Sequence, residues 1–218
     1  VVGFAIFTLL IGGWVSASNA SFNALPGQKL YSLKLTLEKT ELALAINPQQ
    51  KAKLQVEFTS RRLDEMVSLA ANGFQQNTSA VRLAVTQFKN DVRLIQEDLQ
   101  VKNAAPNQTE LAKEVGRKTA GYKTTVADSA AHLPEDFQSE VEEVQTMLDE
   151  TNEAAVQVII TAHETTEDAT AASELKNAFE KELSALRAHT FDKATQEKLD
   201  TAIVLEKEGS YRRAFELL

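Results

Sequence analysis

The sequence predicts an all-α fold, in which antiparallel helical hairpins form a bundle with coiled-coil-like seams behind an N-terminal apolar helix. Helix breakers are scarce, since the 218 residues include only 8 Gly and 4 Pro. Ala, Leu, Glu, Lys and Gln are abundant, and these residues lose little side-chain freedom in a helix. In the middle of the chain, apolar residues recur at alternating intervals of four and three residues. That spacing is the period of a helix and not the two-residue period of a strand.

Proline and glycine divide the chain into expected helices. The breaks fall at Asn47-Pro48, Asn72-Gly73, Ala105-Pro106, Leu133-Pro134 and Glu208-Gly209. The helices expected between these breaks cover residues 28–46, 49–72, 78–101, 107–131, 135–164, 171–189, 192–207 and 210–218. We therefore expect a signal peptide or membrane anchor over 1–20, a helical hairpin over 21–73 and a helical bundle with an acidic distal segment over 74–218.

The first fifteen residues contain no charged side chain. As a helix they would span about 22 Å, less than the roughly 30 Å hydrocarbon layer of a bilayer. The small residues in Val15-Ser16-Ala17 and Ser18-Asn19-Ala20 fit the cleavage site of a signal peptide, whereas Trp14 suits the interface of an uncleaved anchor. The side chains expected to enter the membrane are Phe4, Ile6, Phe7, Leu9, Leu10, Ile11 and Trp14. Both interpretations place the remaining chain outside the cytoplasm.

Regular apolar seams run along the helices expected between residues 78 and 164. The first seam consists of Val81, Val85, Phe88, Val92, Ile95 and Leu99. The second consists of Leu111, Val115, Tyr122, Val126 and Leu133. The third consists of Phe137, Val141, Val144, Leu148, Thr151, Ala155, Val158 and Ala162. Heptad spacing of this kind winds helices into left-handed contacts, and short turns make neighbouring helices antiparallel. We expect these positions to form the core.

The charges are unevenly distributed along a chain whose net charge is −8. Residues 21–62 contain seven basic and three acidic side chains. Residues 124–175 contain no Lys or Arg, and twelve acidic side chains fall between residues 135 and 174. A lysine near an anionic membrane surface gains about 1 kcal/mol. We therefore expect the first helices to lie near the membrane and the acidic helices to point away from it.

Six acidic residues beside the third seam are candidates for an electrostatic contact with a protein partner. They flank the apolar positions and do not occupy them, so we expect their carboxylates to face solvent. They are Glu140, Glu142, Glu143, Asp149, Glu150 and Glu153.

The sequence lacks the usual motifs for catalysis and for metal or cofactor binding. The chain has no cysteine, which excludes thiol catalysis, zinc–thiolate sites and iron–sulfur clusters. The segment from His163 to Glu167 resembles a zinc-protease helix, H-E-x-x-H, but Glu167 stands where the second histidine ligand belongs. His132 and His189 lie near expected helix ends, where an imidazolium suits the helix dipole. We expect no enzymatic activity, no cofactor, no metal and no small-molecule substrate, and the net charge of −8 argues against nucleic-acid binding.

A distinctive motif precedes and opens the first expected helix. It reads Ala24-Leu25-Pro26-Gly27-Gln28-Lys29-Leu30-Tyr31-Ser32-Leu33-Lys34. The Pro-Gly pair predicts a turn, and the leucines at 30, 33 and 37 give the helix an apolar stripe. Further along, residues 51–54 read K-A-K-L and residues 61–65 read R-R-L-D-E.

Residues 24–70 resemble a bacterial envelope domain family of unknown function. That family is marked by an A-L-P-G-x-x-L-Y-x-L-K motif, a helix rich in K-A-x-L and then R-R-L-x-E. This chain departs from the pattern at Gln28, where an acid is usual, and at Ser32, where Pro is usual. The resemblance implies a helical envelope domain behind a signal peptide or anchor, with no known activity.

We therefore expect a membrane-anchored, extracytoplasmic helical scaffold or interaction protein of a bacterial envelope, as a subunit of a larger assembly. Its expected partners are the membrane, through residues 1–15, and a protein partner or a second copy. One alternative is a periplasmic helical chaperone or stress sensor, because residues 47–54 are similar to the L-T-P-x-Q-R-x-x-L segments of such proteins. Another is a filament subunit that packs through its apolar N-terminal helix, although Ala5 stands where type IV pilins usually carry Glu.

Overall fold

The computed structural model describes residues 21–71, 74–100, 106–130, 133, 135–166 and 169–218. The expected apolar helix, its membrane-entering side chains from Phe4 to Trp14 and its cleavage sites all lie outside these residues. Across the part that the structure describes, every regular element is helical, which confirms the all-α class. None of the helices that it describes is both long enough and apolar enough to cross a membrane.

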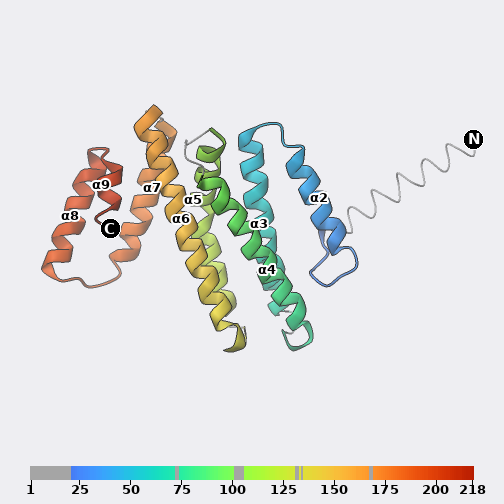
Figure 1. The fold of residues 1–218 in the computed structure, drawn as a ribbon. Helices are drawn as coiled ribbons and strands as arrows, with labels where there is room; N and C mark the ends of the chain where they lie inside the picture. The colour runs from blue at the N-terminus through green and yellow to red at the C-terminus, as the bar shows by residue number, and fades with distance from the viewer. Residues whose placement is uncertain (1–20, 72–73, 101–105, 131–132, 134, 167–168) are drawn as a thin grey trace, which may run out of the picture.

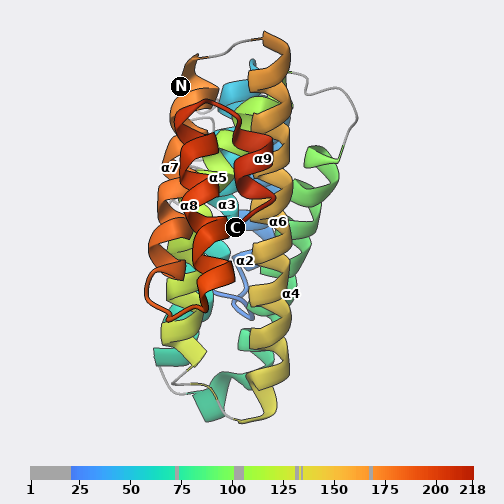
Figure 2. The same ribbon diagram turned by 90° about the vertical axis from the view of Figure 1, so that its left-hand side faces the viewer.

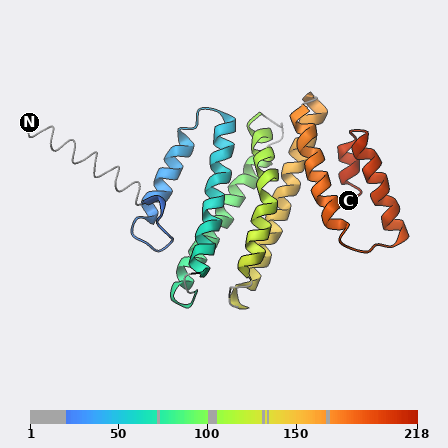
Figure 3. The same cartoon turned by 180° about the vertical axis from the view of Figure 1, so that it is seen from behind.

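The observed helices agree with the expected ones to within a few residues at most ends. They are α2 (Tyr31–Ala43), α3 (Pro48–Ala71), α4 (Phe74–Leu99), α5 (Pro106–Ala130), α6 (Gln138–Thr166), α7 (Ala169–Leu186), α8 (Lys193–Lys207) and α9 (Tyr211–Phe215). A short 3-10 helix, η1 (Glu135–Phe137), precedes α6. Figure 1 shows the helices as a row, with α2 at one edge and α8 and α9 at the other, and Figure 3 shows the same row from behind.

The main apolar core lies among α3, α4, α5 and α6. Helix α5 packs against α3 and α6, while α4 packs against α3 and α6. Nearly all the seam positions expected from the heptad spacing are buried here, and Val158 is only half-buried. The ring of Phe88 meets that of Tyr122 edge to face, with 6.2 Å between centroids. Burial of this seam explains why these helices pack together.

A smaller core joins α7, α8 and α9 at the C-terminal edge, the side that faces the viewer in Figure 2. Phe179 of α7 meets Phe215 edge to face at 5.7 Å. Asp192 caps the start of α8 by accepting a hydrogen bond from the Thr195 backbone N–H. Gly209 ends the same helix with a φ of 75°, a left-handed conformation that glycine adopts without strain.

Helix α2 is attached to the molecule differently from the other helices. Its buried side chains are Tyr31, Lys34 and Glu38, which are all polar. No α2 side chain belongs to either apolar cluster of the described residues. The chain enters α2 through the expected turn, in which Gly27 has a φ of 88°. Polar contacts with α3 therefore hold this helix in place.

Candidate functional site

Five buried polar side chains join α2 to α3, and we call them the α2–α3 ion cluster: Tyr31, Lys34, Glu38, Arg62 and Glu65. Glu65 accepts hydrogen bonds from the Lys34 ammonium at 2.5 Å and from the Tyr31 hydroxyl at 2.9 Å. The Arg62 guanidinium donates to both carboxylate oxygens of Glu38 at 2.7 Å. It also donates to the Tyr31 hydroxyl oxygen at 2.8 Å. The five side chains thus form one connected network.

The α2–α3 ion cluster is electrically balanced and excluded from solvent. Arg62 is 0% exposed, and the two acidic residues of the cluster are each 4% exposed. Burying an isolated charge costs several kcal/mol, so such groups are stable only when they are paired and hydrogen-bonded. Burial raises the pKa of Glu38, and the neighbouring Arg62 charge opposes that rise. Burial also raises the pKa of Tyr31, which keeps its hydroxyl protonated as a donor to Glu65.

Two further charged residues flank the cluster. Arg61 contacts Glu38 at 3.3 Å and Glu57 at 2.6 Å, and its guanidinium lies 5.1 Å from the centre of the Phe58 ring. Asp91 of α4 is half-buried, and its burial raises its pKa to about 6 although the Arg62 charge opposes the rise. The charges around α2 therefore extend to a third helix.

The cluster fixes the position of α2 and leaves little room for a ligand. Its charges already pair with one another, and its side chains are shielded from solvent. Most of its members belong to the motifs that carry the family resemblance, since Tyr31 and Lys34 come from L-Y-x-L-K and Arg62 and Glu65 from R-R-L-x-E. Glu38 belongs to neither motif, although it lies one turn after Lys34 and so shares its helix face.

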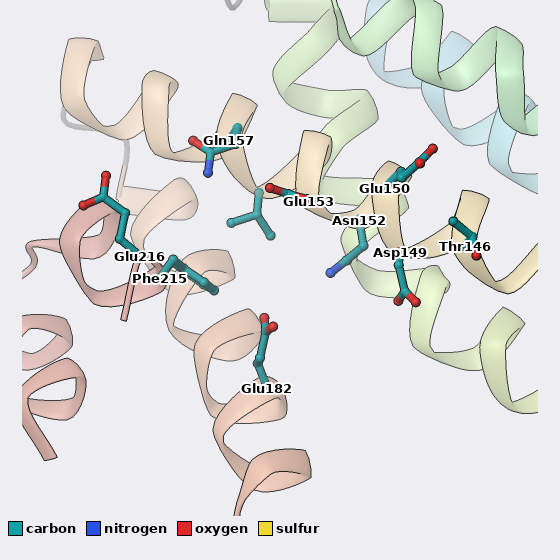
Figure 4. Close-up of a pocket in the computed structure, with 10 residues that line it drawn as sticks. Thr146, Asp149, Glu150, Asn152, Glu153, Gln157, Glu182, Phe215 and Glu216 are labelled. Atoms are coloured by element: carbon teal, nitrogen blue, oxygen red, sulfur yellow. The ribbon is translucent and has the colours of Figure 1, made fainter. Parts of the chain in front are cut away.

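A second candidate site is an open cleft between α6, α7 and the end of α9. Its volume is about 510 Å³. We call it the acidic cleft, and its carboxylates are Asp149, Glu150, Glu153, Glu182 and Glu216. Figure 4 shows these lining residues together with Phe215; the Glu182 side chain extends from α7 toward α6, while the carboxylates of Glu150 and Glu216 point away from it. Partial desolvation in the cleft raises the pKa of Glu182, with the Lys123 charge opposing this rise and those of Asp149 and Glu153 adding to it.

The structure separates the six acidic residues predicted as an interaction surface into two groups. Asp149, Glu150 and Glu153 line the acidic cleft. The other three lie outside it. Glu140 accepts a hydrogen bond from Arg82 at 2.9 Å, Glu143 pairs with Lys89 at 2.5 Å and with Arg93 at 3.8 Å, and Glu142 is exposed.

Several acidic side chains of α6 and α7 form salt bridges with basic residues of other helices. Basic side chains from α4, α5 and α9 pair with carboxylates of α6 and α7. The pairs are Arg82–Glu140, Lys89–Glu143, Arg93–Glu143, Lys123–Asp149, Arg117–Glu174 and Arg212–Glu164. The absence of Lys and Arg from residues 124–175 therefore does not leave all of these acids unpaired, because their basic partners come from other helices. Glu182 and Glu216 were not among the predicted residues, because they reach the cleft from α7 and from the residue after α9, whereas the predicted acids all lie on α6.

His163 is placed in a packed environment. Its ring meets that of Tyr211 edge to face at 5.3 Å, and its buried Nδ1 lacks a hydrogen-bond partner among the described residues. The next residue, Glu164, pairs with Arg212 at 2.7 Å. Glu167 and His132 lie outside the described residues. Within the described ranges, no group of three or more His, Asp or Glu side chains could hold a metal ion.

Comparison with known families identifies a domain of unknown function (DUF5667) at residues 23–121. The matched segment contains the whole α2–α3 ion cluster and extends through much of α5. It agrees with the resemblance to an uncharacterised family and reaches further than residues 24–70. A search of curated proteins and a search of solved structures gave no match.

Proposed function

We propose that this protein is a membrane-anchored, extracytoplasmic scaffold of a bacterial envelope that binds a basic protein segment in its acidic cleft. Residues 1–15 would provide the anchor, and helical hairpins with coiled-coil-like seams would carry the cleft away from the membrane. The proposal assigns no catalytic role and no nucleic-acid partner. The domain match supports no particular activity, so the proposal depends on the geometry.

The arrangement of the cleft carboxylates carries this proposal. Five carboxylates, from α6, from α7 and from the residue that follows α9, line one open hollow of about 510 Å³. Among the described residues, Asp149 is the one member of this set with a salt bridge, which it forms with Lys123. A partner segment bearing Lys or Arg would neutralise the remaining charges. Because the cleft is open to solvent, the attraction should weaken as salt shortens the Debye length from about 10 Å at 0.1 M to about 3 Å at 1 M.

The test measures binding of a fluorescent lysine-rich peptide to the full chain by anisotropy. The variant Glu153→Gln should bind more weakly than the unaltered chain at low salt, with the difference disappearing at 1 M salt. Glu142→Gln is the matched control, because Glu142 is an exposed carboxylate of the same helix outside the cleft. Equal losses in the two variants would show that net charge alone attracts the peptide, and the cleft would then have no specific role.

A second measurement addresses placement and the alternatives. Intact mass of the native protein reports whether residues 1–20 are retained, and membrane fractionation reports where the protein lies. Retention in the membrane fraction supports the anchored scaffold. Removal of these residues would favour a periplasmic chaperone or stress sensor, and large assemblies in detergent would favour a filament subunit.

A further inference from the structure

Helix α9 bridges α6 and α7 beside the acidic cleft. Its Phe215 ring meets that of Phe179 on α7 edge to face at 5.7 Å. Its Tyr211 ring meets that of His163 on α6 edge to face at 5.3 Å. Phe215 and the residue that follows α9, Glu216, line the cleft (Figure 4). The position of α9 relative to α6 therefore contributes to the width of the cleft.

Arg212 provides a polar contact between α9 and α6. Its guanidinium forms two hydrogen bonds with the Glu164 carboxylate, in which Nε donates to Oε1 at 3.0 Å and Nη2 donates to Oε2 at 2.7 Å. The third nitrogen, Nη1, donates to Oε1 of Gln157 at 3.3 Å. Paired bonds of this kind fix the orientation of an arginine as well as its distance from the carboxylate. We call Arg212, Glu164 and Gln157 the α6–α9 latch.

The α6–α9 latch adjoins the acidic cleft directly. Gln157 belongs to the latch and also lines the cleft. Glu216 lies one turn after Arg212, and its backbone N–H donates to the Arg212 carbonyl at 3.1 Å. A movement of α9 that breaks the latch therefore also moves residues of the cleft wall. The hydrogen bond from Arg212 lowers the pKa of Glu164 below its ordinary value of 4.5, so the pair stays charged at neutral pH.

The hairpin of α8 and α9 has little other attachment to the main bundle. Among the buried residues of the described chain, Tyr211 is the one member of these two helices that belongs to the main apolar core. Their other buried residues belong to the smaller core that they share with α7. Segments with few buried apolar contacts to the rest of a protein open most easily. The latch lies next to Tyr211 in the sequence and reinforces this single apolar attachment.

We propose that Arg212 is a positioning residue of the acidic cleft, which holds α9 against α6 at the separation where a basic segment binds. This inference rests on the proposed function, because it assigns Arg212 a role in that same cleft. Arg212 acts through the placement of Phe215 and Glu216 and not through contact with the bound segment. The paired side chains are 41% and 47% exposed, and an exposed pair of this kind changes an equilibrium constant by up to about fivefold.

Binding of the lysine-rich peptide separates this role from plain charge attraction, because the two predict changes of opposite sign. Arg212→Glu replaces a positive charge beside the cleft with a negative one, so charge attraction alone would strengthen binding of the peptide to the full chain. If Arg212 positions the cleft, the variant should instead bind the peptide about two- to fivefold more weakly at low salt, because Glu164 would then repel α9.

Arg213→Glu is the matched control for this variant. Arg213 is the exposed neighbour of Arg212 on the same helix and does not line the cleft, and its substitution changes the net charge equally. This control should bind the peptide at least as tightly as the unaltered chain. Equally tight binding by Arg212→Glu and Arg213→Glu would overturn the positioning role, because the peptide would then respond only to charge.

Reversing the pair tests whether the contact with Glu164 is responsible. The double variant Arg212→Glu/Glu164→Arg has the net charge of the unaltered chain and can form the same pair with its charges exchanged. Recovery of peptide binding in the double variant would support the latch. Binding as weak as that of Arg212→Glu alone would overturn the assignment to this pair.

A distance measurement tests the latch without any peptide. The chain has no cysteine, so Glu142→Cys on α6 and Val204→Cys on α8, both exposed, give a unique pair of spin labels. Electron–electron resonance should show a longer or broader distance distribution when Arg212→Glu is added, and an unchanged distribution would overturn the latch. A changed distribution in a chain whose unaltered form binds no peptide would contradict the proposed function and the role of Arg212 in binding, but not the contact between α9 and α6.

Discussion

At the scale of single residues, Arg62 and Glu65 each contact three other members of the α2–α3 ion cluster, and Arg62 is the more deeply buried of the two. It is 0% exposed and contacts Glu38, Tyr31 and Glu65, the last at 3.3 Å. A buried ion pair adds little net stability compared with apolar packing, but removing one partner leaves an uncompensated charge. The cluster therefore acts mainly by fixing one orientation of α2.

Arg62→Met should reduce the free energy of unfolding by about 3–5 kcal/mol, because it leaves Glu38 and Glu65 buried with fewer positive partners. Chemical denaturation measures the change. Arg93→Met is the matched control, since Arg93 is 52% exposed and lies 3.8 Å from Glu143, and it should cost less than about 1 kcal/mol. Equal effects of the two variants would mean that the cluster is open to solvent.

Asp91 should make the protein more stable in mild acid than at neutral pH. Its pKa is raised from 3.8 to about 6, so between these values the folded state binds more protons than the unfolded state. Stability therefore rises as pH falls through 6 toward 4 and is lost as pH rises above 6. Arg62, Glu38, Glu65 and Lys39 all face this carboxyl, and Arg62 and Lys39 limit the shift.

Asp91→Asn removes the titrating group and should stabilise the protein at pH 7, by at most about 3 kcal/mol. It should also flatten the pH dependence between pH 4 and 7. Denaturation at pH 5 and pH 7 for both proteins measures the difference. An unchanged pH dependence in the variant would assign the effect to another group, such as Glu38, whose pKa is also raised.

At the scale of helices, the seam of α4 is a clear test of the packing. The Phe88 ring is 1% exposed and meets Tyr122, whose hydroxyl donates to the Val56 carbonyl at 2.7 Å. Phe88→Ala should cost about 3–5 kcal/mol in chemical denaturation, since it leaves a cavity among three helices. Leu94→Ala, on an exposed face of the same helix, should cost less than about 0.5 kcal/mol. A loss below about 1 kcal/mol for Phe88→Ala would contradict burial of the seam.

The seams could be predicted because heptad spacing is a local property of the sequence. Val81, Phe88 and Leu148 are all buried where the period placed them. The inner face of α2 could not be predicted in this way, since a leucine stripe ordinarily marks the buried side of an amphipathic helix. The charges that turn its polar side inward come from Arg62 and Glu65, about thirty residues away.

The acidic cleft was predictable only in part for a related reason. The density of acids on α6 indicated Asp149, Glu150 and Glu153, whereas Glu182 and Glu216 reach the same hollow only through the packing of α7 and α9. The salt bridges of Glu140 and Glu143 likewise depend on basic residues more than fifty positions earlier in the chain. A single sequence shows which residues are charged, but it does not show which helices pack against one another.

At the scale of the whole molecule, the row of helices separates two kinds of surface. Helix α2, with the exposed Lys39 and with the exposed Lys29 just before it, forms one edge, and the acidic cleft lies toward the other (Figures 1 and 3). A membrane that attracts the first edge turns the second toward the surroundings. Partner binding in the cleft and lipid contact at α2 are then compatible in one molecule.

The whole-molecule prediction concerns orientation on the membrane. In liposomes that contain amine-reactive headgroups, the full chain should cross-link through Lys29 and Lys39, which are exposed on and beside α2. Lys34 should react little, because it is 4% exposed and bonded to Glu65. Lys181 and Lys198 are the controls, since they are exposed on α7 and α8 near the opposite edge.

Mass spectrometry of the cross-linked peptides measures the preference at increasing salt. In low salt an anionic surface attracts the lysines of α2 and repels the carboxylates of the cleft, and both effects favour the same orientation. The preference should decline between 0.1 M and 1 M salt as the Debye length falls from about 10 Å to about 3 Å. Cross-links that favour Lys181 and Lys198 over Lys29 and Lys39 would contradict this orientation, because they would place the acidic edge against the bilayer.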